Sequence, residues 1–145
     1  MIRGLVLCLL MLLVVGCSSE HQALQVADLV RVIDGDTIVV EIGKTNERVR
    51  LIGVDTPEWG EPGFDVARKF TQDLLGDGRI MLERDQSERD KYGRLLRYVY
   101  SSTGIMVNDQ LIRAGLADLM TIEPDTKYRL GTVTKRVVHP TEMGR

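Results

Sequence analysis

The stretch LQVADLVRVIDGDTIVVEIGKTNERVRLIGV, residues 24–54, decides the fold of this chain. Within it, Ile38, Val40 and Ile42 fall on one face of an alternating segment, which is typical of a β-strand that faces a core. An Asp-Gly pair and a Gly-Lys-Thr-Asn run separate the apolar segments and are turn signals. Strands joined by such short turns predict an antiparallel meander. The three strands are expected at residues 24–33, 37–42 and 47–54.

Two helices and two further strands are predicted after the meander. Apolar residues at helical spacing from Phe64 to Leu74 predict a helix that stops at Gly76, and a second helix is expected from Val107 to Gly115. The strands are expected at residues 79–83 and 94–100. This order of elements predicts an α+β, mainly β fold, with a five-stranded OB-type Greek-key barrel and two or three helices packed on it.

The N-terminus has the pattern of an export signal. A short basic start precedes an apolar run at residues 5–15, which is shorter than the roughly 20 residues that a membrane-spanning helix needs. The run ends at small residues before Cys17, an arrangement that resembles a bacterial lipobox. We expect Cys17 to be lipidated and to anchor the protein in the cell envelope, facing outside the cytoplasm; the alternative is an ordinary signal peptide with an incidental cysteine.

The remaining patterns complete the domain division. Cys8 and Cys17 are the two cysteines, so we expect neither a disulfide nor a thiolate metal site in the mature domain. The C-terminal tail is interrupted by Pro124, Gly131 and Pro140, and we expect it to dock loosely. The predicted segments are a lipoprotein signal peptide at 1–16, a tether at 17–23, an OB-fold domain at 24–123 and a poorly assigned tail at 124–145.

The charge balance limits the kinds of partner. The chain has 19 Lys and Arg residues against 21 Asp and Glu, a net charge of −2. Domains that bind nucleic acid are usually basic overall, so this balance argues against tight non-specific binding. The net charge is still compatible with a basic groove on one part of the surface.

Three short motifs carry the chemistry: DGDT at residues 34–37, RLIGVDTPE at 50–58 and DKYGR at 90–94. Each alone has a structural explanation, as a plain turn, a capped strand end or a solvated strand face. Together they supply oxygen ligands for a hard cation such as Ca²⁺ or Mg²⁺, and guanidinium groups that match a phosphate. Their order and spacing favour a phosphodiesterase.

The expected barrel can bring the acidic residues to one rim. Asp36 starts one predicted strand and Asp55 ends another, so the two carboxylates can form a hard-cation site. Glu58, three residues after Asp55, could activate a water near that cation. His21 and His139 have no partners in the sequence, and we do not expect either to be a ligand.

In these three motifs the chain resembles the staphylococcal nuclease family, over about residues 26–117. The resemblance implies an OB-type barrel that hydrolyses DNA and RNA phosphodiesters with Ca²⁺ and leaves 3′-phosphate ends. It implies that Asp36 and Asp55 are side-chain ligands of Ca²⁺ and that Thr56 adds its carbonyl oxygen.

The resemblance also assigns the remaining site residues. It implies that Arg50 and Arg94 hold the phosphate, that Glu58 is the general base, and that Lys91 and Tyr92 lie in the nucleotide pocket. The chain departs from the family in two places. Residues 118–123 lack the tyrosines that line the base pocket of well-known members, and the interrupted tail does not resemble their long charged helix.

We therefore predict a monomeric, lipid-anchored, Ca²⁺-dependent endonuclease with DNA or RNA as substrate. One alternative is a catalytically silent OB-fold module that binds nucleic acid, although such modules typically lose the polar site residues that this chain keeps. Another is a structural envelope lipoprotein in which the same residues form surface ion pairs.

Overall fold

The computed structural model describes residues 24–76 and 78–131. The predicted signal peptide, Cys17, His21 and the tail from residue 132 onward, including His139, lie outside these residues. In chain order the elements are β1 Gln25–Val32, β2 Thr37–Ile42, β3 Thr45–Leu51, β4 Val54–Asp55, α1 Phe64–Leu75, β5 Arg79–Glu83, β6 Leu95–Tyr100, α2 Val107–Arg113 and β7 Asp118–Leu119. In the described ranges, no helix is long and apolar enough to cross a membrane.

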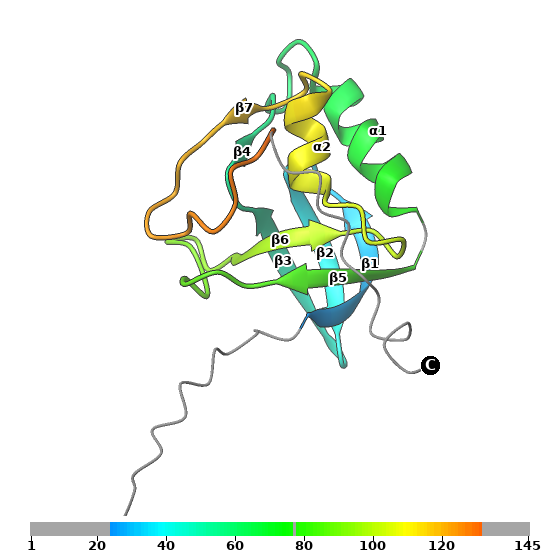
Figure 1. Cartoon of the computed structure of the whole chain (residues 1–145). Helices are drawn as coiled ribbons and strands as arrows, with labels where there is room; N and C mark the ends of the chain where they lie inside the picture. Colours follow the sequence, from blue (N-terminus) through cyan, green and yellow to red (C-terminus); the bar gives the residue numbers. More distant parts are fainter. Residues whose placement is uncertain (1–23, 77, 132–145) are drawn as a thin grey trace, which may run out of the picture.

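Five strands form a closed barrel in the order β1-β2-β3-β6-β5 (Figure 1). The expected meander is confirmed, because β2 pairs antiparallel with both β1 and β3. β5 pairs antiparallel with β1 and with β6. The barrel closes through a parallel pair between β3 and β6, in which Val49 lies opposite Leu95 and Arg50 opposite Leu96. This mixed barrel with two helices confirms the predicted OB-type fold class.

The third predicted strand is interrupted. β3 ends at Leu51, and the chain turns at Gly53, whose φ of +80° lies in the left-handed region that favours glycine. Leu130 also packs there, so that a Cβ on Gly53 would lie 2.8 Å from the Leu130 Cδ1. The rest of the predicted strand becomes β4, which pairs with β7, a two-residue strand that the sequence did not predict.

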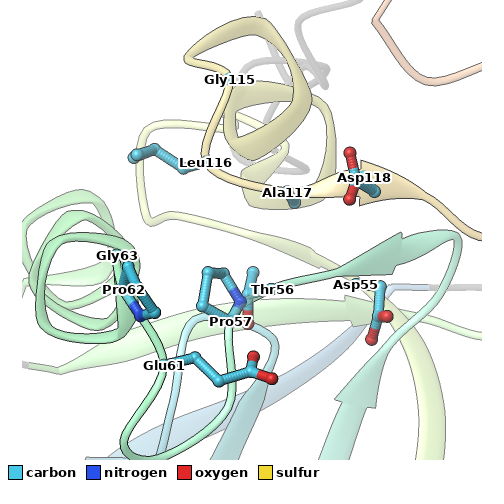
Figure 2. A pocket seen from close by; sticks show the side chains of 10 residues that line it. All are labelled: Asp55, Thr56, Pro57, Glu61, Pro62, Gly63, Gly115, Leu116, Ala117 and Asp118. Atoms are coloured by element: carbon cyan, nitrogen blue, oxygen red, sulfur yellow. The ribbon is translucent and has the colours of Figure 1, made fainter.

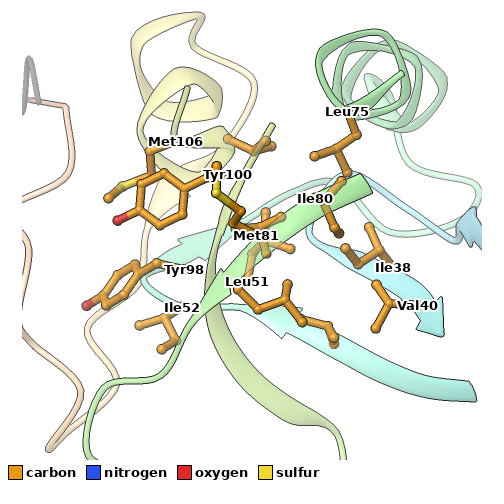
Figure 3. Close-up of a cluster of buried hydrophobic side chains, with 14 of the residues drawn as sticks. Ile38, Val40, Leu51, Ile52, Leu75, Ile80, Met81, Tyr98, Tyr100 and Met106 are labelled. Atoms are coloured by element: carbon orange, nitrogen blue, oxygen red, sulfur yellow. The ribbon is translucent and has the colours of Figure 1, made fainter. Parts of the chain in front are cut away.

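The core fills the barrel and extends to the two helices. Ile38, Leu51 and Ile80 are fully buried inside the barrel, and Leu75 of α1 points toward Ile80 (Figure 3). The α1 residues that are buried recur at helical spacing: Phe64, Ala67, Thr71 and Leu75. Figure 1 shows α1 and α2 side by side over one end of the barrel.

Residues 124–131 correct the expectation of a loosely docked tail. Asp125 accepts hydrogen bonds from the backbone N–H groups of Gln86 and Ser87 at 2.9 and 2.7 Å. The Tyr128 hydroxyl lies 3.0 and 3.1 Å from the two oxygens of the buried Glu83 carboxylate. Leu130 is 5% exposed and joins the core. Because side-chain hydrogen bonds rather than a periodic element hold this segment, its sequence carries no repeating signal.

Candidate active site

Asp36 lies in the turn between β1 and β2 and is buried, 3% exposed. Its Oδ2 accepts a hydrogen bond from the Thr56 backbone N–H at 2.8 Å, and its Oδ1 accepts one from the Thr37 hydroxyl at 3.1 Å. The Asp36 backbone N–H donates to the Asp34 carboxylate at 3.0 Å, which fixes the turn. The DGDT motif is therefore both a turn and a means of burying one carboxylate against the loop after β4.

Gly35 makes this close approach possible. A Cβ at this position would lie 2.7 to 2.9 Å from side-chain atoms of Thr56 and Ala67. The Thr71 hydroxyl, from the buried face of α1, donates to the Gly35 carbonyl oxygen at 2.7 Å. The glycine thus provides the space that brings β2, α1 and the loop after β4 together at one rim of the barrel.

Arg50 is buried, 7% exposed, and lies between two carboxylates. Its Nη1 lies 3.1 Å from Asp36 Oδ2, and its Nη2 lies 3.1 Å from Asp55 Oδ1. Nη1 also donates to the carbonyl oxygens of Leu51 and Val54, at 3.0 and 2.6 Å. This burial and pairing rule out the alternative that Arg50 belongs to a solvated strand face.

The Asp36 carboxylate is incompletely compensated. Burial raises its pKa to about 6, although the Arg50 guanidinium and the hydrogen bond from Thr56 both lower it. Asp55 is half exposed, with 56% of its side chain accessible. A desolvated carboxylate next to a partly exposed one favours an added positive charge.

The donor set at this rim fits a hard cation. Asp36 and Asp55 offer carboxylate oxygens, and the Thr56 carbonyl is one residue further along the chain. Among residues 24–76 and 78–131, no three His, Cys, Asp or Glu side chains gather as a ready metal cluster. A cation held here would therefore take two carboxylates and complete its shell with carbonyl and water oxygens, which Ca²⁺ accepts.

Glu58 lies two residues beyond Thr56 and is exposed. Its backbone N–H donates to the Glu61 carboxylate at 2.8 Å, and its carbonyl oxygen accepts from the Glu61 N–H at 2.9 Å. Its own carboxylate has no hydrogen-bond or ion-pair partner in the described part of the chain. The structure thus puts Glu58 on the same loop as Asp55 and Thr56 but does not bring it into contact with Arg50.

Arg94 is held within its own loop. Its Nε lies 2.6 Å from Asp90 Oδ2, and its backbone N–H donates to Asp90 Oδ1 at 2.9 Å. Burial of Asp90 raises the pKa of this carboxyl, but hydrogen bonds from Arg94 and Tyr92 outweigh burial and hold the pKa below its usual value. The loop therefore fixes Arg94 before any substrate binds.

The strand register relates Arg94 to Arg50. Arg50 lies opposite Leu96 in the parallel pair, and Arg94 is two residues before Leu96, in the loop that leads into β6. The offset along the strands is about 7 Å. The register thus places the loop that carries Arg94 beside the end of β3 that carries Arg50.

Lys91 and Tyr92 lie at the exposed tip of the same loop. The Tyr92 side chain is 69% exposed. The Lys91 Nζ and the Arg94 guanidinium carbon lie 5.0 and 5.4 Å from the centre of the Tyr92 ring. The two cations can bind a phosphate, and the exposed ring can stack on a base.

A cavity of about 310 Å³ adjoins Asp55 (Figure 2). The loop before α1 lines one side of this cavity, and residues 115–118 after α2 line the other. Sequence reasoning missed Glu61 and Asp118 as cavity residues. Asp118 lies opposite Asp55 in the β4–β7 pair, and a two-residue strand leaves no periodic signal that could have revealed this.

The fold and the rim define a class: a small, mainly β, OB-type barrel whose rim combines oxygen ligands with fixed guanidinium groups. The chain belongs to the staphylococcal nuclease family. The family model described as "Staphylococcal nuclease homologue" matches residues 48–135. The match includes Arg50, Asp55, Glu58 and Arg94 and begins after Asp36.

Curated relatives agree with this membership. The chain is 45% identical to the thermonuclease of Staphylococcus intermedius over 106 residues, which cover 69% of this chain and 62% of that protein. It is 40% identical to the thermonuclease of Staphylococcus hyicus over 120 residues, covering 79% and 69%. It is 41% identical to endonuclease YncB of Bacillus subtilis over 119 residues, covering 77% and 56%. The chain thus spans less than two thirds of the first and third of these relatives.

Proposed function

We propose that this protein is a Ca²⁺-dependent endonuclease that hydrolyses DNA or RNA and leaves 3′-phosphate ends. The observation that carries the proposal is the buried Arg50 guanidinium between the Asp36 and Asp55 carboxylates. Membership of a family whose relatives are named thermonuclease and endonuclease supports it.

The cation would be held by the Asp36 and Asp55 carboxylates and the Thr56 carbonyl. When bound, Ca²⁺ supplies positive charge that neutralises the phosphate and polarises a water. Oxygen donors are the ligands that this ion prefers, and Mg²⁺ demands a stricter octahedral geometry. We therefore expect Ca²⁺ to support the reaction better than Mg²⁺.

The two arginines stabilise the charge that develops on the phosphate. Nη1 of Arg50 is fixed by the Leu51 and Val54 carbonyl oxygens. Nη2 contacts the partly exposed Asp55 and the Met120 sulfur, and a phosphate oxygen would reach the guanidinium from this more open side. Arg94 comes from the loop before the neighbouring strand β6 and is oriented by Asp90. Donors fixed in advance toward a developing negative charge contribute strongly to catalysis.

Glu58 acts as the general base. Its carboxylate is exposed and has no partner among the described residues, so it is available to accept a proton from a water. The water oxygen bonds to phosphorus, and the bond from phosphorus to the 5′ oxygen breaks. The phosphate stays on the 3′ oxygen, and the 5′ oxygen takes up a proton.

The nucleotide is bound beside this centre. Tyr92 provides an exposed ring and Lys91 a cation for a terminal phosphate. Because residues 118–123 lack the tyrosines of well-known members, we expect base binding to be weaker or differently selective. We also propose that the protein is a monomer that Cys17 anchors to the envelope, which the sequence alone supports.

The test is a cleavage assay with plasmid DNA and with RNA, in Ca²⁺, in Mg²⁺ and in excess chelator. We expect cleavage in Ca²⁺, none in chelator, and products whose 3′ ends must be dephosphorylated before a polymerase extends them. Arg50→Lys is the matched control for a contaminating nuclease. Binding of nucleic acid without cleavage would contradict the proposal and indicate a silent binding module.

A further inference from the structure

Trp59 is the one tryptophan of this chain, and its side chain is 83% exposed. It is the most exposed of the large hydrophobic residues in the described ranges. Tryptophan is highly buried on average in folded proteins, so this degree of exposure needs a reason. An exposed aromatic ring next to a binding rim is a candidate contact for a ligand with a flat apolar face.

A closed turn holds Trp59 in place. The Glu58 carbonyl oxygen accepts from the Glu61 N–H at 2.9 Å, and the Glu58 N–H donates to the Glu61 carboxylate at 2.8 Å. Residues 58–61 form a β-turn in which Gly60 is the third position, and its φ of +88° is one that glycine adopts without strain. The Trp59 ring meets the buried Phe64 ring edge to face, with centroids 5.3 Å apart and planes at 82°.

The turn therefore presents a pre-oriented ring to solvent. Two hydrogen bonds between Glu58 and Glu61 fix the turn, and the contact with Phe64 orients the Trp59 ring, while most of the Trp59 surface stays open. Ordering a side chain before binding lowers the entropic cost of binding. A pre-oriented, exposed ring is typical of a residue that binds a ligand rather than of an apolar side chain that is exposed by chance.

Trp59 is close to the candidate metal ligands along the chain. It is four positions after Asp55, a Cα–Cα distance of at most about 14 Å even in an extended chain. Tyr92, the other strongly exposed aromatic residue near the rim, comes from the loop that holds Arg94. Two loops that leave the rim thus each carry one open aromatic ring.

The charge around Trp59 favours a nucleobase over a membrane surface. Glu58, Glu61 and Asp65 surround it in the sequence, and all three are exposed. Anionic lipid headgroups attract basic segments and repel acidic ones. A nucleobase is neutral, and the arginines at the rim take the phosphate, so the acidic neighbours do not oppose stacking on the ring.

We propose that Trp59 is a stacking platform for a nucleobase of the substrate strand that flanks the scissile phosphate. The inference rests on the proposed nuclease function. It adds a second base contact, on a different loop from Tyr92. Stacking on an aromatic ring tolerates every base, because each base has a π-face. Trp59 therefore contributes affinity for single-stranded substrate without selecting a sequence.

The single tryptophan makes the contact directly observable. The probe is a short single-stranded phosphorothioate DNA, which resists hydrolysis, titrated in Ca²⁺ into the purified mature protein. We expect quenching of Trp59 emission, and little quenching by the same oligomer with abasic sites. Trp59→Ala should weaken binding of the fluorescently labelled oligomer by about 5- to 150-fold, from typical base-stacking energies. Trp59→Phe, which keeps a ring, should lose less.

The control is Val66→Ala, which shortens another exposed apolar side chain, on α1, and should leave binding unchanged. Binding without a change in Trp59 emission, with unchanged affinity in Trp59→Ala, would overturn the inference and leave the nuclease proposal standing. A blue shift of emission with phosphatidylglycerol vesicles but no response to DNA would also overturn it. Absence of both binding and cleavage would overturn the inference together with the proposed function.

Discussion

Arg50 and Asp36 form a buried ion pair, with 3.1 Å between Nη1 and Oδ2 and side-chain exposures of 8% and 4%. Desolvation makes such a pair costly to separate, because either partner alone would remain as a buried charge. The same guanidinium reaches Asp55 through Nη2. One planar group thus bridges two carboxylates, which a lysine with a single ammonium cannot reproduce.

Arg50→Lys should therefore lose most of its turnover. We expect kcat to fall by on the order of 10²–10³, the usual cost of removing one donor to a developing charge. The measurement is the initial rate of oligonucleotide cleavage in saturating Ca²⁺. Arg48→Lys, at an exposed position two residues earlier in β3, is the control, and near-normal turnover in Arg50→Lys would refute the assignment.

Asp90→Asn should destabilise the protein in a pH-dependent way. The folded-state pKa of Asp90 is lowered, so its contribution to stability is fully present above the unfolded pKa and is lost as pH falls through the folded pKa. Loss of the charged hydrogen bonds to Arg94 should cost about 1 kcal/mol at neutral pH. Urea unfolding should show the wild-type and variant curves converging in acid, and a constant difference would exclude this origin.

Calcium should raise the melting temperature of the protein. A ligand that binds only the folded state stabilises it by an amount that grows with the logarithm of its concentration. Differential scanning fluorimetry should show this rise with Ca²⁺, a smaller one with Mg²⁺, and reversal by chelator. Asp55→Asn should reduce the rise, and full cleavage activity in excess chelator would refute the metal assignment.

Leu130→Ala should show that the segment after Pro124 belongs to the folded domain. Leu130 is buried against Gly53, so removing its side chain should cost about 2–4 kcal/mol. Leu119→Ala is the matched control, because that leucine is 66% exposed and should cost less than about 0.5 kcal/mol. Equal free energies of unfolding for the two variants in urea would instead support the first expectation, that this segment is loosely docked.

Cys17→Ser should release the protein from membranes. The apolar run at residues 5–15 is too short to span a bilayer, and stable anchoring needs more than one acyl chain or an added signal. Cell fractionation should move the exported variant to the soluble fraction. A variant that stays with the membranes after a high-salt wash would exclude lipid anchoring.

The barrel could be predicted because its strands alternate and its turns carry strong local signals. β2 and β5 have the predicted bounds, and α1 begins and ends where Phe64 and Gly76 indicated. The parallel pairing of β3 with β6 could not be read from periodicity, because it joins segments far apart in the sequence. The packing of Leu130 at Gly53, where β3 ends, also joins residues distant in the sequence.

The candidate site was only partly predictable for a similar reason. The types and order of Asp36, Arg50 and Asp55 indicated a cation and a phosphate, but not that Arg50 is buried between the two acids. The turn that carries Asp36 also packs through Gly35 against Thr56 and helix α1, which are distant in the sequence. Trp59 carried no signal at all, since exposure of one aromatic residue is a property of the folded surface.

The parallel β3–β6 pair also has a consequence for the order of folding. Pairings between segments distant in sequence form late, because the intervening chain loses entropy before the contacts stabilise it. The segments that carry Arg50 and Arg94 become neighbours when the β3–β6 pair forms. An early intermediate with the β1–β2–β3 meander alone would be inert, so the return of cleavage during refolding would report when β6 joins β3.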